Sequence, residues 1–348
     1  SKIVKTETEE VAEKYGDDRR THVVKSGVKT LNVEDLIADE DQTLVLTSGG
    51  YIKRTNPDEF KKQKRGGVGV VDLNTKEEDF VTTFLTASTH SDVLFFTDKG
   101  KVYQVKMYDL PEGKRATRGK SIMNFLPIDQ DEKVTSVRAM PKEVKDMDLS
   151  VLMVTKNGVV KRVDAASFHD VRRNGIIAIK LAPEDQLKSV SFIGLDDTAI
   201  IVTENGQSIR FEAKDAREMG RAAAGVRGIK LGKGDSVVAA RTIAKDWENP
   251  ELLVLMANGY GKKTSLEEYK IQNRGGSGIK TAKVTVKTGK VIGAHVVTKE
   301  QSEIIAMSKN SQVIRIDIEG IPALGRQTQG VRIMKMRAGD SIASLICL

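Results

Sequence analysis

The chain repeats one pattern about every fifty residues, and this repeat constrains the fold more than any other feature. An apolar run, a polar turn and a strand-like run recur six times, and the turns end at Gly50, Gly100, Gly158, Gly206, Gly259 and Ser311. A second glycine follows each turn 17 or 19 residues later, at Gly67, Gly119, Gly175, Gly225, Gly276 and Gly330. Because both landmarks keep one register, chance similarity among glycine-rich turns does not explain the pattern.

Each repeat unit is predicted to form four strands joined by turns and one long polar loop. The Asn-Gly turns of three units favour a two-residue type I′ hairpin. A sheet of fifty residues buries its face poorly alone, so six sheets are expected to close into a propeller-like ring. The predicted fold class is all-β, with units that begin near residues 42, 92, 149, 198, 251 and 303.

One helix is predicted before the repeats. Thr8 precedes two acidic residues and Gly16 follows Tyr15, so a helix is expected over 8–15. We therefore expect a helical lead-in at 1–24 and the ring domain at 25–348. No apolar run is long enough for a membrane helix, and the first residues lack a secretory signal. The prediction is a protein without a membrane partner.

Composition argues against catalytic and metal sites. The one cysteine, Cys347, permits no internal disulfide, which favours a reducing compartment. The four histidines lie far apart in the sequence, so a zinc site is not expected. The six tyrosines lack a catalytic context, and a pair of His169 with Asp170 is read as an ordinary polar contact. No catalytic residue, metal or cofactor is predicted in this chain.

The positive charge is concentrated in one part of each unit. The chain has 56 Lys and Arg against 48 Asp and Glu, a net charge of +8. The six segments between the turn and the second glycine hold 25 of those cations and 13 of the acids, so they carry +12 and the rest carries −4. If the units surround an axis, these segments form a basic belt that suits duplex DNA. Solubility of edge strands alone does not require the remainder to be acidic.

Nineteen cations in and around these segments are predicted to contact DNA phosphates without reading bases. They are Lys53, Arg54, Lys61, Lys62, Lys64, Arg65, Lys114, Arg115, Arg118, Lys161, Arg162, Arg172, Arg173, Arg210, Arg217, Arg221, Lys262, Lys263 and Arg274. The net charge of the segments falls along the chain, which predicts the firmest DNA contact at the early units.

The most specific local motif is Gln63-Lys64-Arg65-Gly66-Gly67-Val68-Gly69. It lacks the Lys-Ser/Thr pair of a mononucleotide-binding P-loop, and strands rather than a helix are expected after it. The motif resembles the Gln-Arg-Arg-Gly-Gly-Lys-Gly box of the DNA gyrase A C-terminal domain family. Val68 stands where that box usually has a basic residue. Gln272-Asn273-Arg274-Gly275-Gly276-Ser277-Gly278 repeats the pattern in the fifth unit, so part of the motif is ordinary architecture of the repeat.

The resemblance covers essentially the whole chain and implies several properties. It implies a six-bladed β-pinwheel in which neighbouring blades exchange strands, and a box that closes the ring between the first and last blades. The implied role is to bind and wrap duplex DNA for negative supercoiling. The implied partners are the gyrase A breakage-reunion domain, which residues 13–21 resemble at its junction, and through it gyrase B. ATP, Mg²⁺ and the cleaving tyrosine would belong to the holoenzyme outside this chain. A monomeric domain in the bacterial cytoplasm, associated with the nucleoid, is expected.

Three alternatives remain at this point. The C-terminal domain of the topoisomerase IV A protein is similar but has a degenerate or absent box and often fewer blades, so six units with a box favour gyrase. A propeller that serves as a protein-interaction module would fit the repeats but not the basic belt. A propeller enzyme would need carboxylates or histidines that converge at one mouth of the ring, and the sequence shows none.

Overall fold

The computed structural model describes residues 2–17, 33–60, 79–114, 117–310 and 312–347 of the 348-residue chain. Their contacts divide the chain into two units, 1–38 and 39–348. The predicted domain boundary at 24/25 and the junction over 18–21 lie outside the described residues. None of the helices in the described ranges is long and apolar enough to span a bilayer.

The first unit contains the helix α1 (Lys2–Tyr15) and a short 3-10 helix, η1 (Val33–Leu36). α1 starts six residues earlier than predicted. The Thr8 hydroxyl donates to the carbonyl of Val4, 2.6 Å away, so Thr8 lies inside the helix and does not cap it. The predicted end is confirmed, because the N–H of Gly16 closes the last turn on Ala12. α1 has no buried residue, so it contributes no described core.

The second unit is a ring of six sheets, which confirms the predicted six-bladed all-β fold. We number the sheets as blades 1 to 6 and give their strands from the axis outwards. Blade 1 has β3 (Val81–Ser88), β1 (Asp41–Thr47), β2 (Tyr51–Thr55) and β6 (Lys120–Ser121). Blade 2 has β7 (Val134–Ala139), β4 (Asp92–Thr97), β5 (Lys101–Lys106) and β10 (Ile176–Ile177). Blade 3 has β11 (Leu187–Gly194), β8 (Leu149–Thr155), β9 (Val159–Asp164) and β14 (Val226–Arg227).

The other three blades continue this order. Blade 4 has β15 (Val237–Ile243), β12 (Thr198–Thr203), β13 (Gln207–Glu212) and β18 (Ile279–Lys280). Blade 5 has β19 (Val291–Val297), β16 (Glu251–Met256), β17 (Tyr260–Ser265) and β22 (Val331–Arg332). Blade 6 has, among the described residues, β23 (Ile342–Cys347), β20 (Glu303–Ser308) and β21 (Val313–Asp317). Short 3-10 helices join strands at 57–60, 107–109, 122–124, 144–146, 165–168, 213–215, 266–268 and 318–320.

Neighbouring blades exchange strands. In each of blades 1 to 5, the outer strand has two residues and comes from the next unit of the sequence. For example, β6 follows β5 of blade 2 in the sequence but pairs with β2 of blade 1. These five outer strands are called the exchanged strands. The segment of blade 1 at the equivalent place in sequence is 61–78, outside the described residues. A glycine with positive φ precedes each exchanged strand, and in the fifth unit it is Gly278, not Gly276 as the sequence suggested.

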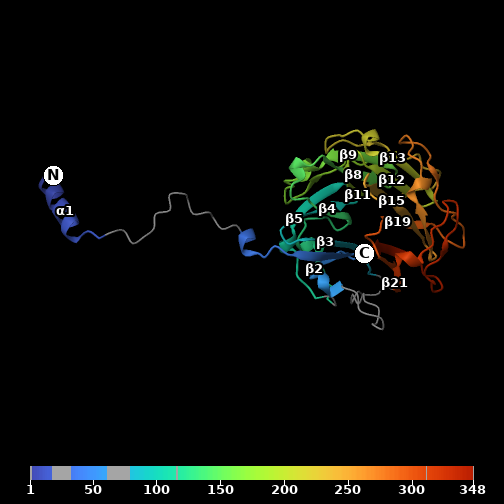
Figure 1. Cartoon of the computed structure of the whole chain (residues 1–348), viewed down its shortest axis with the longest axis horizontal. Helices are drawn as coiled ribbons and strands as arrows, with labels where there is room; N and C mark the ends of the chain where they lie inside the picture. The colour runs from blue at the N-terminus through green and yellow to red at the C-terminus, as the bar shows by residue number, and fades with distance from the viewer. Residues whose placement is uncertain (1, 18–32, 61–78, 115–116, 311, 348) are drawn as a thin grey trace. The chain divides into compact units, whose positions relative to one another are not determined.

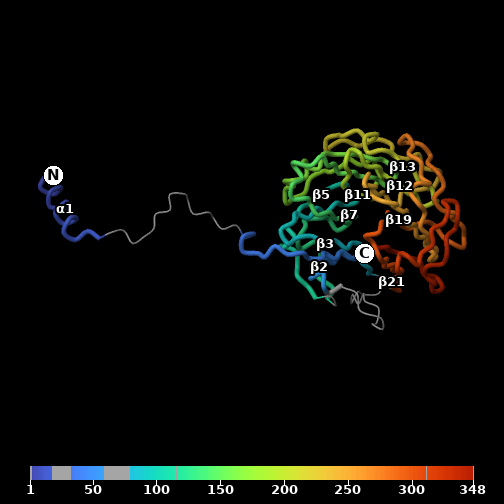
Figure 2. Tube along the Cα trace, in the orientation of Figure 1, coloured from blue at the N-terminus to red at the C-terminus, as the bar shows by residue number. Residues whose placement is uncertain are grey.

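The inner strands close the ring. Each inner strand lies beside the next one around the axis, and β23 returns to β3. The Ser344 hydroxyl donates to the Val81 carbonyl at 2.7 Å across this closure, and Val45, Ile305 and Ile346 pack together beside it. In Figures 1 and 2 the red end of the ring accordingly meets its blue beginning.

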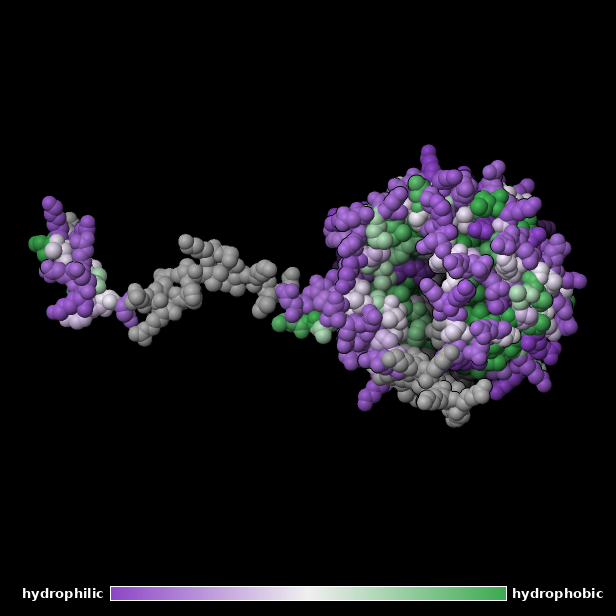
Figure 3. Space-filling model, in the orientation of Figure 1, coloured by the Kyte–Doolittle hydropathy of each residue, from purple (hydrophilic) through white to green (hydrophobic). Residues whose placement is uncertain are grey.

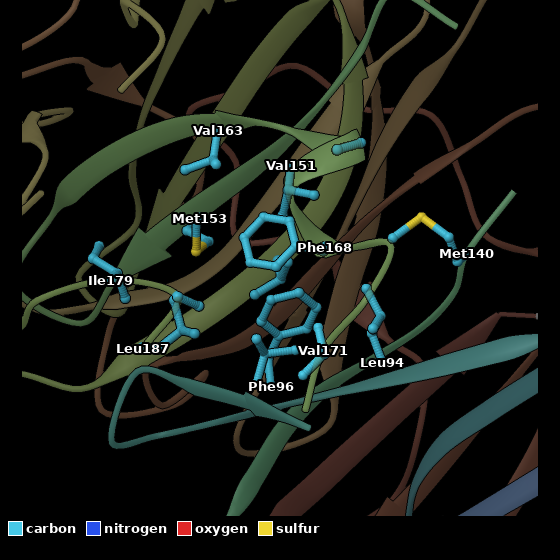
Figure 4. Close-up of a cluster of buried hydrophobic side chains, with 14 of the residues drawn as sticks. Leu94, Phe96, Met140, Val151, Met153, Val163, Phe168, Val171, Ile179 and Leu187 are labelled. Carbon is cyan, nitrogen blue, oxygen red and sulfur yellow. The ribbon is translucent and has the colours of Figure 1, made fainter. Parts of the chain in front are cut away.

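The hydrophobic core is divided among the interfaces between blades. One cluster joins blades 2 and 3, where Phe96 and Phe168 meet edge to face with ring centroids 5.9 Å apart (Figure 4). Similar clusters join the other neighbouring blades, including the last with the first. A blade therefore buries its apolar side chains only against its neighbours, as the repeat argument predicted.

The turns of the repeats differ from the prediction. Gly158 and Gly206 have φ of 81° and 80°, but the asparagines before them do not enter the left-handed region, so these are not type I′ turns. The N–H groups of Asn157 and Asn205 donate instead to the carboxylates of Asp185 and Asp235, both at 3.0 Å. Each carboxylate thus fixes the turn of its own blade, and the hairpin prediction itself is confirmed.

Candidate nucleic-acid interface

Three of the predicted DNA-binding lysines are buried, at the same place in blades 1, 3 and 5. Each is the third residue of its strand: Lys53 in β2, Lys161 in β9 and Lys262 in β17. Their exposed fractions are 1%, 0% and 0%. Their side chains have no surface to offer to a phosphate. The prediction that these three contact DNA is therefore wrong.

The buried lysines hold the loop of the next blade. The Lys53 ammonium donates to the carbonyls of Lys114 at 2.9 Å and Thr117 at 2.7 Å. Lys262 donates to the carbonyls of Gly325 and Arg326 at 2.6 and 2.7 Å. Burial lowers the pKa of Lys262 to about 8. These lysines stabilise the path of the chain towards the exchanged strands.

Lys161 makes a related arrangement in blade 3. Its ammonium donates to the carbonyl of Ala178 in its own unit, at 2.8 Å, and to that of Arg221 in the loop of the next blade. Burial, with a smaller contribution from the Arg221 guanidinium, lowers the pKa of Lys161 to about 8. The even blades have Tyr103, Ile209 and Ile314 at the same distance from the turn, which shows that it is a core position of the repeat.

The residue after each of these positions is also used inside the fold. Arg54 donates to the Leu110 carbonyl and Arg162 to the Ala216 carbonyl, at 3.0 and 2.9 Å. Arg210 donates to the Leu266 carbonyl at 2.9 Å, and Lys263 pairs with Glu251 at 2.9 Å. Because these contacts hold the four side chains against their own scaffold, we withdraw the four cations from the proposed DNA contacts.

The remaining predicted cations fall into three groups. Those with exposed side chains are Lys114, Arg172, Arg173, Arg217 and Arg221. Arg118 and Arg274 are half-buried: Arg118 stacks on the Tyr51 ring at 3.4 Å, and Arg274 donates to the Asp215 and Arg227 carbonyls. The others lie outside the described residues: Lys61, Lys62, Lys64, Arg65 and Arg115, together with the whole box, Gln63, Lys64, Arg65, Gly66, Gly67, Val68 and Gly69.

A second set of cations lies beyond the segments that the sequence indicated, because those segments ended at the second glycine. Four lie on the exchanged strands, and four come three residues after the end of an exchanged strand. They are Lys120, Arg227, Lys280 and Arg332, then Lys180, Lys230, Lys283 and Lys335. All eight are exposed, and within the described part of the chain none has an ion pair. We call these eight residues the outer basic row.

Backbone contacts join four consecutive exchanged segments, those of blades 2 to 5. The N–H of Lys180 donates to Ala223, that of Lys230 to Gly276 and that of Lys283 to Thr328, at 3.2, 2.8 and 3.0 Å. Each acceptor belongs to the loop before the next exchanged strand, so consecutive exchanged segments touch one another. These cations therefore follow the outer edge of the ring, where the surface in Figure 3 is largely hydrophilic.

Among the described residues, no group of three or more His, Cys, Asp or Glu side chains is placed to hold a metal ion. Tyr103 and Tyr269 are buried, and their hydroxyls contact Glu132 and Thr281. His169 and Asp170 lie 3.6 Å apart on the surface. These contacts agree with ordinary packing and polar surface.

The six blades match a known family one by one. The sequence matches the DNA gyrase C-terminal domain, β-propeller, over residues 41–88, 91–139, 150–193, 197–244, 251–298 and 302–348. The DNA gyrase A protein of Lawsonia intracellularis is 39% identical over 337 residues, which are 97% of this chain and 41% of that protein. The gyrase A protein of Staphylococcus epidermidis is 38% identical over 343 residues, 99% of this chain and 38% of that protein. The chain thus spans about two fifths of these relatives.

Solved structures share the fold. A DNA gyrase A C-terminal domain has a TM-score of 0.73 and 26% identity, covering 88% of this chain and 99% of that one. A DNA topoisomerase IV C-terminal domain has a TM-score of 0.72 and 24% identity, covering 90% and 94%. The fold alone does not separate gyrase from topoisomerase IV. The chain is a member of the DNA gyrase C-terminal domain, β-propeller, family.

Proposed function

We propose that this domain binds duplex DNA along the outer edge of its ring and wraps it. The observation that carries the proposal is the outer basic row, which is exposed, unpaired within the described residues and joined from blade to blade. On this proposal the Lys and Arg side chains of the row contact phosphates, which carry no base-sequence information.

Wrapping requires energy that phosphate contacts can supply. Smooth bends of 40–90° over a short site cost about 1–6 kcal/mol, so a near U-turn costs on the order of 10 kcal/mol. Release of counterions at several phosphates offsets this cost, and the binding then weakens steeply as salt rises. A protein surface can wrap DNA in this way without reading its bases.

The wider assembly follows from the relatives and belongs to the same proposal. Within a gyrase A protein, the domain would follow the breakage-reunion domain and would act with gyrase B in the bacterial cytoplasm. The chiral wrap would make strand passage introduce negative supercoils. On this proposal the domain itself uses no cofactor, while ATP and Mg²⁺ serve the holoenzyme, and the predicted box would be needed for supercoiling.

The test is a circle-ligation assay with the 348-residue chain. Nicked circles are ligated with the chain present, and the linking number is read after the protein is removed. We expect a change of one consistent sign at low salt that disappears as salt rises. Binding without a change in linking number would reject wrapping and leave only a DNA anchor. A topoisomerase IV domain is the second candidate, and supercoiling by a holoenzyme that carries this domain separates it from gyrase.

A further inference from the structure

The inner strands present one tier of side chains around the axis of the ring. Each blade contributes one inner-strand residue to this tier. In the neighbouring strand, the partner of that residue is apolar and lies three positions before the last residue of the strand. The six are Leu85, Arg138, Ser191, Arg241, His295 and Ile346. The tier is polar in blades 2 to 5 and apolar at the closure between blades 6 and 1. Five of the six side chains are half-buried, and Figure 3 shows the ring hollowed near its centre.

Two arginines of this tier lack a counter-charge. Arg138 donates to the Val137 carbonyl at 2.8 Å, and Arg241 donates to the Ala240 carbonyl at 2.9 Å. Neither has a carboxylate within ion-pair distance among the residues that the structure describes. Burial, followed by repulsion from Arg241, lowers the pKa of Arg138 to about 10. The Val137 and Ala240 carbonyls each accept one of the five N–H groups that an arginine carries.

The groups around the arginines supply no negative charge. The Nη2 of Arg241 lies 3.1 Å from the Nε2 of His295. Burial and the two arginines lower the pKa of His295 well below its usual value, so its imidazole is neutral and accepts from Arg241. Burial raises the pKa of Cys347, which interacts with Arg241, to about 12, so it is a neutral thiol. An excess of positive charge therefore remains on the inner strands, where its solvation is incomplete.

We propose that Arg138 and Arg241 bind a small oxyanion of the phosphate class at the centre of the ring. The planar N–H pairs of a guanidinium match two oxygens of a tetrahedral oxyanion, and the strand register places Arg138 and Arg241 on one tier of the inner strands. Ser191, which lies between them in the order of the blades, adds a hydroxyl donor. This site goes beyond the DNA contacts of the outer edge. The site lies on the innermost strands of the sheets, whereas the proposed DNA contacts lie at the outermost strands. Its occupant is therefore free phosphate and not the DNA backbone.

The first experiment uses His295 as a reporter in the unaltered chain. Its imidazole contacts Arg241, and the chain has only four histidines, so H295Q identifies its NMR signals. We expect inorganic phosphate to shift these signals in a saturable way, with a Kd of about 1 mM or below. Chloride at equal ionic strength should not do so. An equal response to both salts, or no response to phosphate, overturns the proposal. The titration itself uses the unaltered chain, and H295Q has to fold only for the assignment of the signals.

The second experiment separates the two sites. R138Q and R241Q should each weaken phosphate binding by about tenfold or more, whereas R138K should keep part of it because the charge remains. Phosphate should raise the unfolding temperature of the natural chain more than that of either Gln variant. Duplex DNA affinity should stay the same in all variants that fold. Loss of DNA affinity together with phosphate binding would show that the arginines serve the DNA contacts, and it would overturn the central site while leaving the proposed function in place.

Discussion

Lysine has opposite roles on two parts of this ring. In the odd blades, the lysines of β2, β9 and β17 are buried and donate to backbone carbonyls: Lys53, Lys161 and Lys262. The lysines of the outer basic row are exposed beside the exchanged strands and have no ion pair within the described residues. The same residue type therefore stabilises the scaffold at one position and is available to DNA at the other. Burial and hydrogen-bond partners decide between the roles, not the count of charges.

The largest effect is expected from the outer row. Replacing Lys180, Lys230, Lys283 and Lys335 by Gln should lower the salt dependence of duplex binding by about 0.9 per contact, or about 3.6 in total. The affinity at about 0.1 M salt should fall by about a thousandfold. Binding measured against salt checks both values. The control replaces Lys133, Lys145, Lys245 and Lys299, which are exposed but outside the exchanged segments. Equal losses in the two sets would show that only net charge matters.

The next effect concerns the placement of an exchanged strand. A Cβ on Gly330, which has φ of 76°, would lie 2.4 Å from the Gly261 carbonyl oxygen. Gly339 has a similar φ of 77° but no atom within 4 Å of such a Cβ. We expect Gly330→Ala to destabilise the ring by about 3 kcal/mol and Gly339→Ala by about 1 kcal/mol. Denaturant unfolding of the two variants measures the difference, and equal costs would refute the close approach.

A smaller effect is expected at a buried lysine. Lys161→Met keeps the length of the side chain but leaves the carbonyls of Ala178 and Arg221 without their donor. The free energy of unfolding should fall by about 2 kcal/mol, whereas Lys230→Met, at an exposed position, should change it by less than about 0.5 kcal/mol. Each folded variant is then tested for DNA binding. A loss of DNA affinity in Lys161→Met that matches Lys230→Met would remove the distinction between the two kinds of lysine.

The smallest effect is a dependence on pH. Burial lowers the pKa of Lys161 and Lys262 from 10.5 to about 8, so the unfolded chain binds more protons between these values. Stability should therefore rise as pH increases from about 8 to 10.5, because the cost of burying the charge is present below pH 8 and is relieved above it. The comparison is with Lys161→Met/Lys262→Met, measured by unfolding across this range. The natural chain should gain relative to the double variant, and a parallel response would contradict the assignment.

The repeat predicted the ring because its signals are local. An apolar run, a turn glycine and a second glycine recur in each unit, so neither long-range contacts nor the exchange of strands had to be known to count six blades. The type I′ turns were wrong because carboxylates distant in sequence, such as Asp185, hold the turn amides. A single-sequence pattern does not reveal such a partner.

The site was predicted less well because a blade inside the ring is covered on both faces. Pairs such as Lys161-Arg162 were read as one exposed patch, although both side chains are buried and donate to backbone carbonyls. A signal for this burial is present in the sequence: Tyr103, Ile209 and Ile314 occupy the lysine position in the even blades. The sequence also contains a signal for the outer basic row: a lysine lies five residues after the second glycine, as Lys230 does after Gly225.

The exchange of strands has a consequence for how such a ring changes its size in evolution. Each of units 2 to 6 gives its outermost strand to the unit before it, and each of units 1 to 5 takes one from the unit after it. A duplication of one whole unit therefore supplies a donor and a recipient together, and its deletion removes both. The number of blades can therefore change by one without leaving an unpaired sheet edge in the interior of the series. Only the junction where the last blade meets the first then has to adapt to the new number.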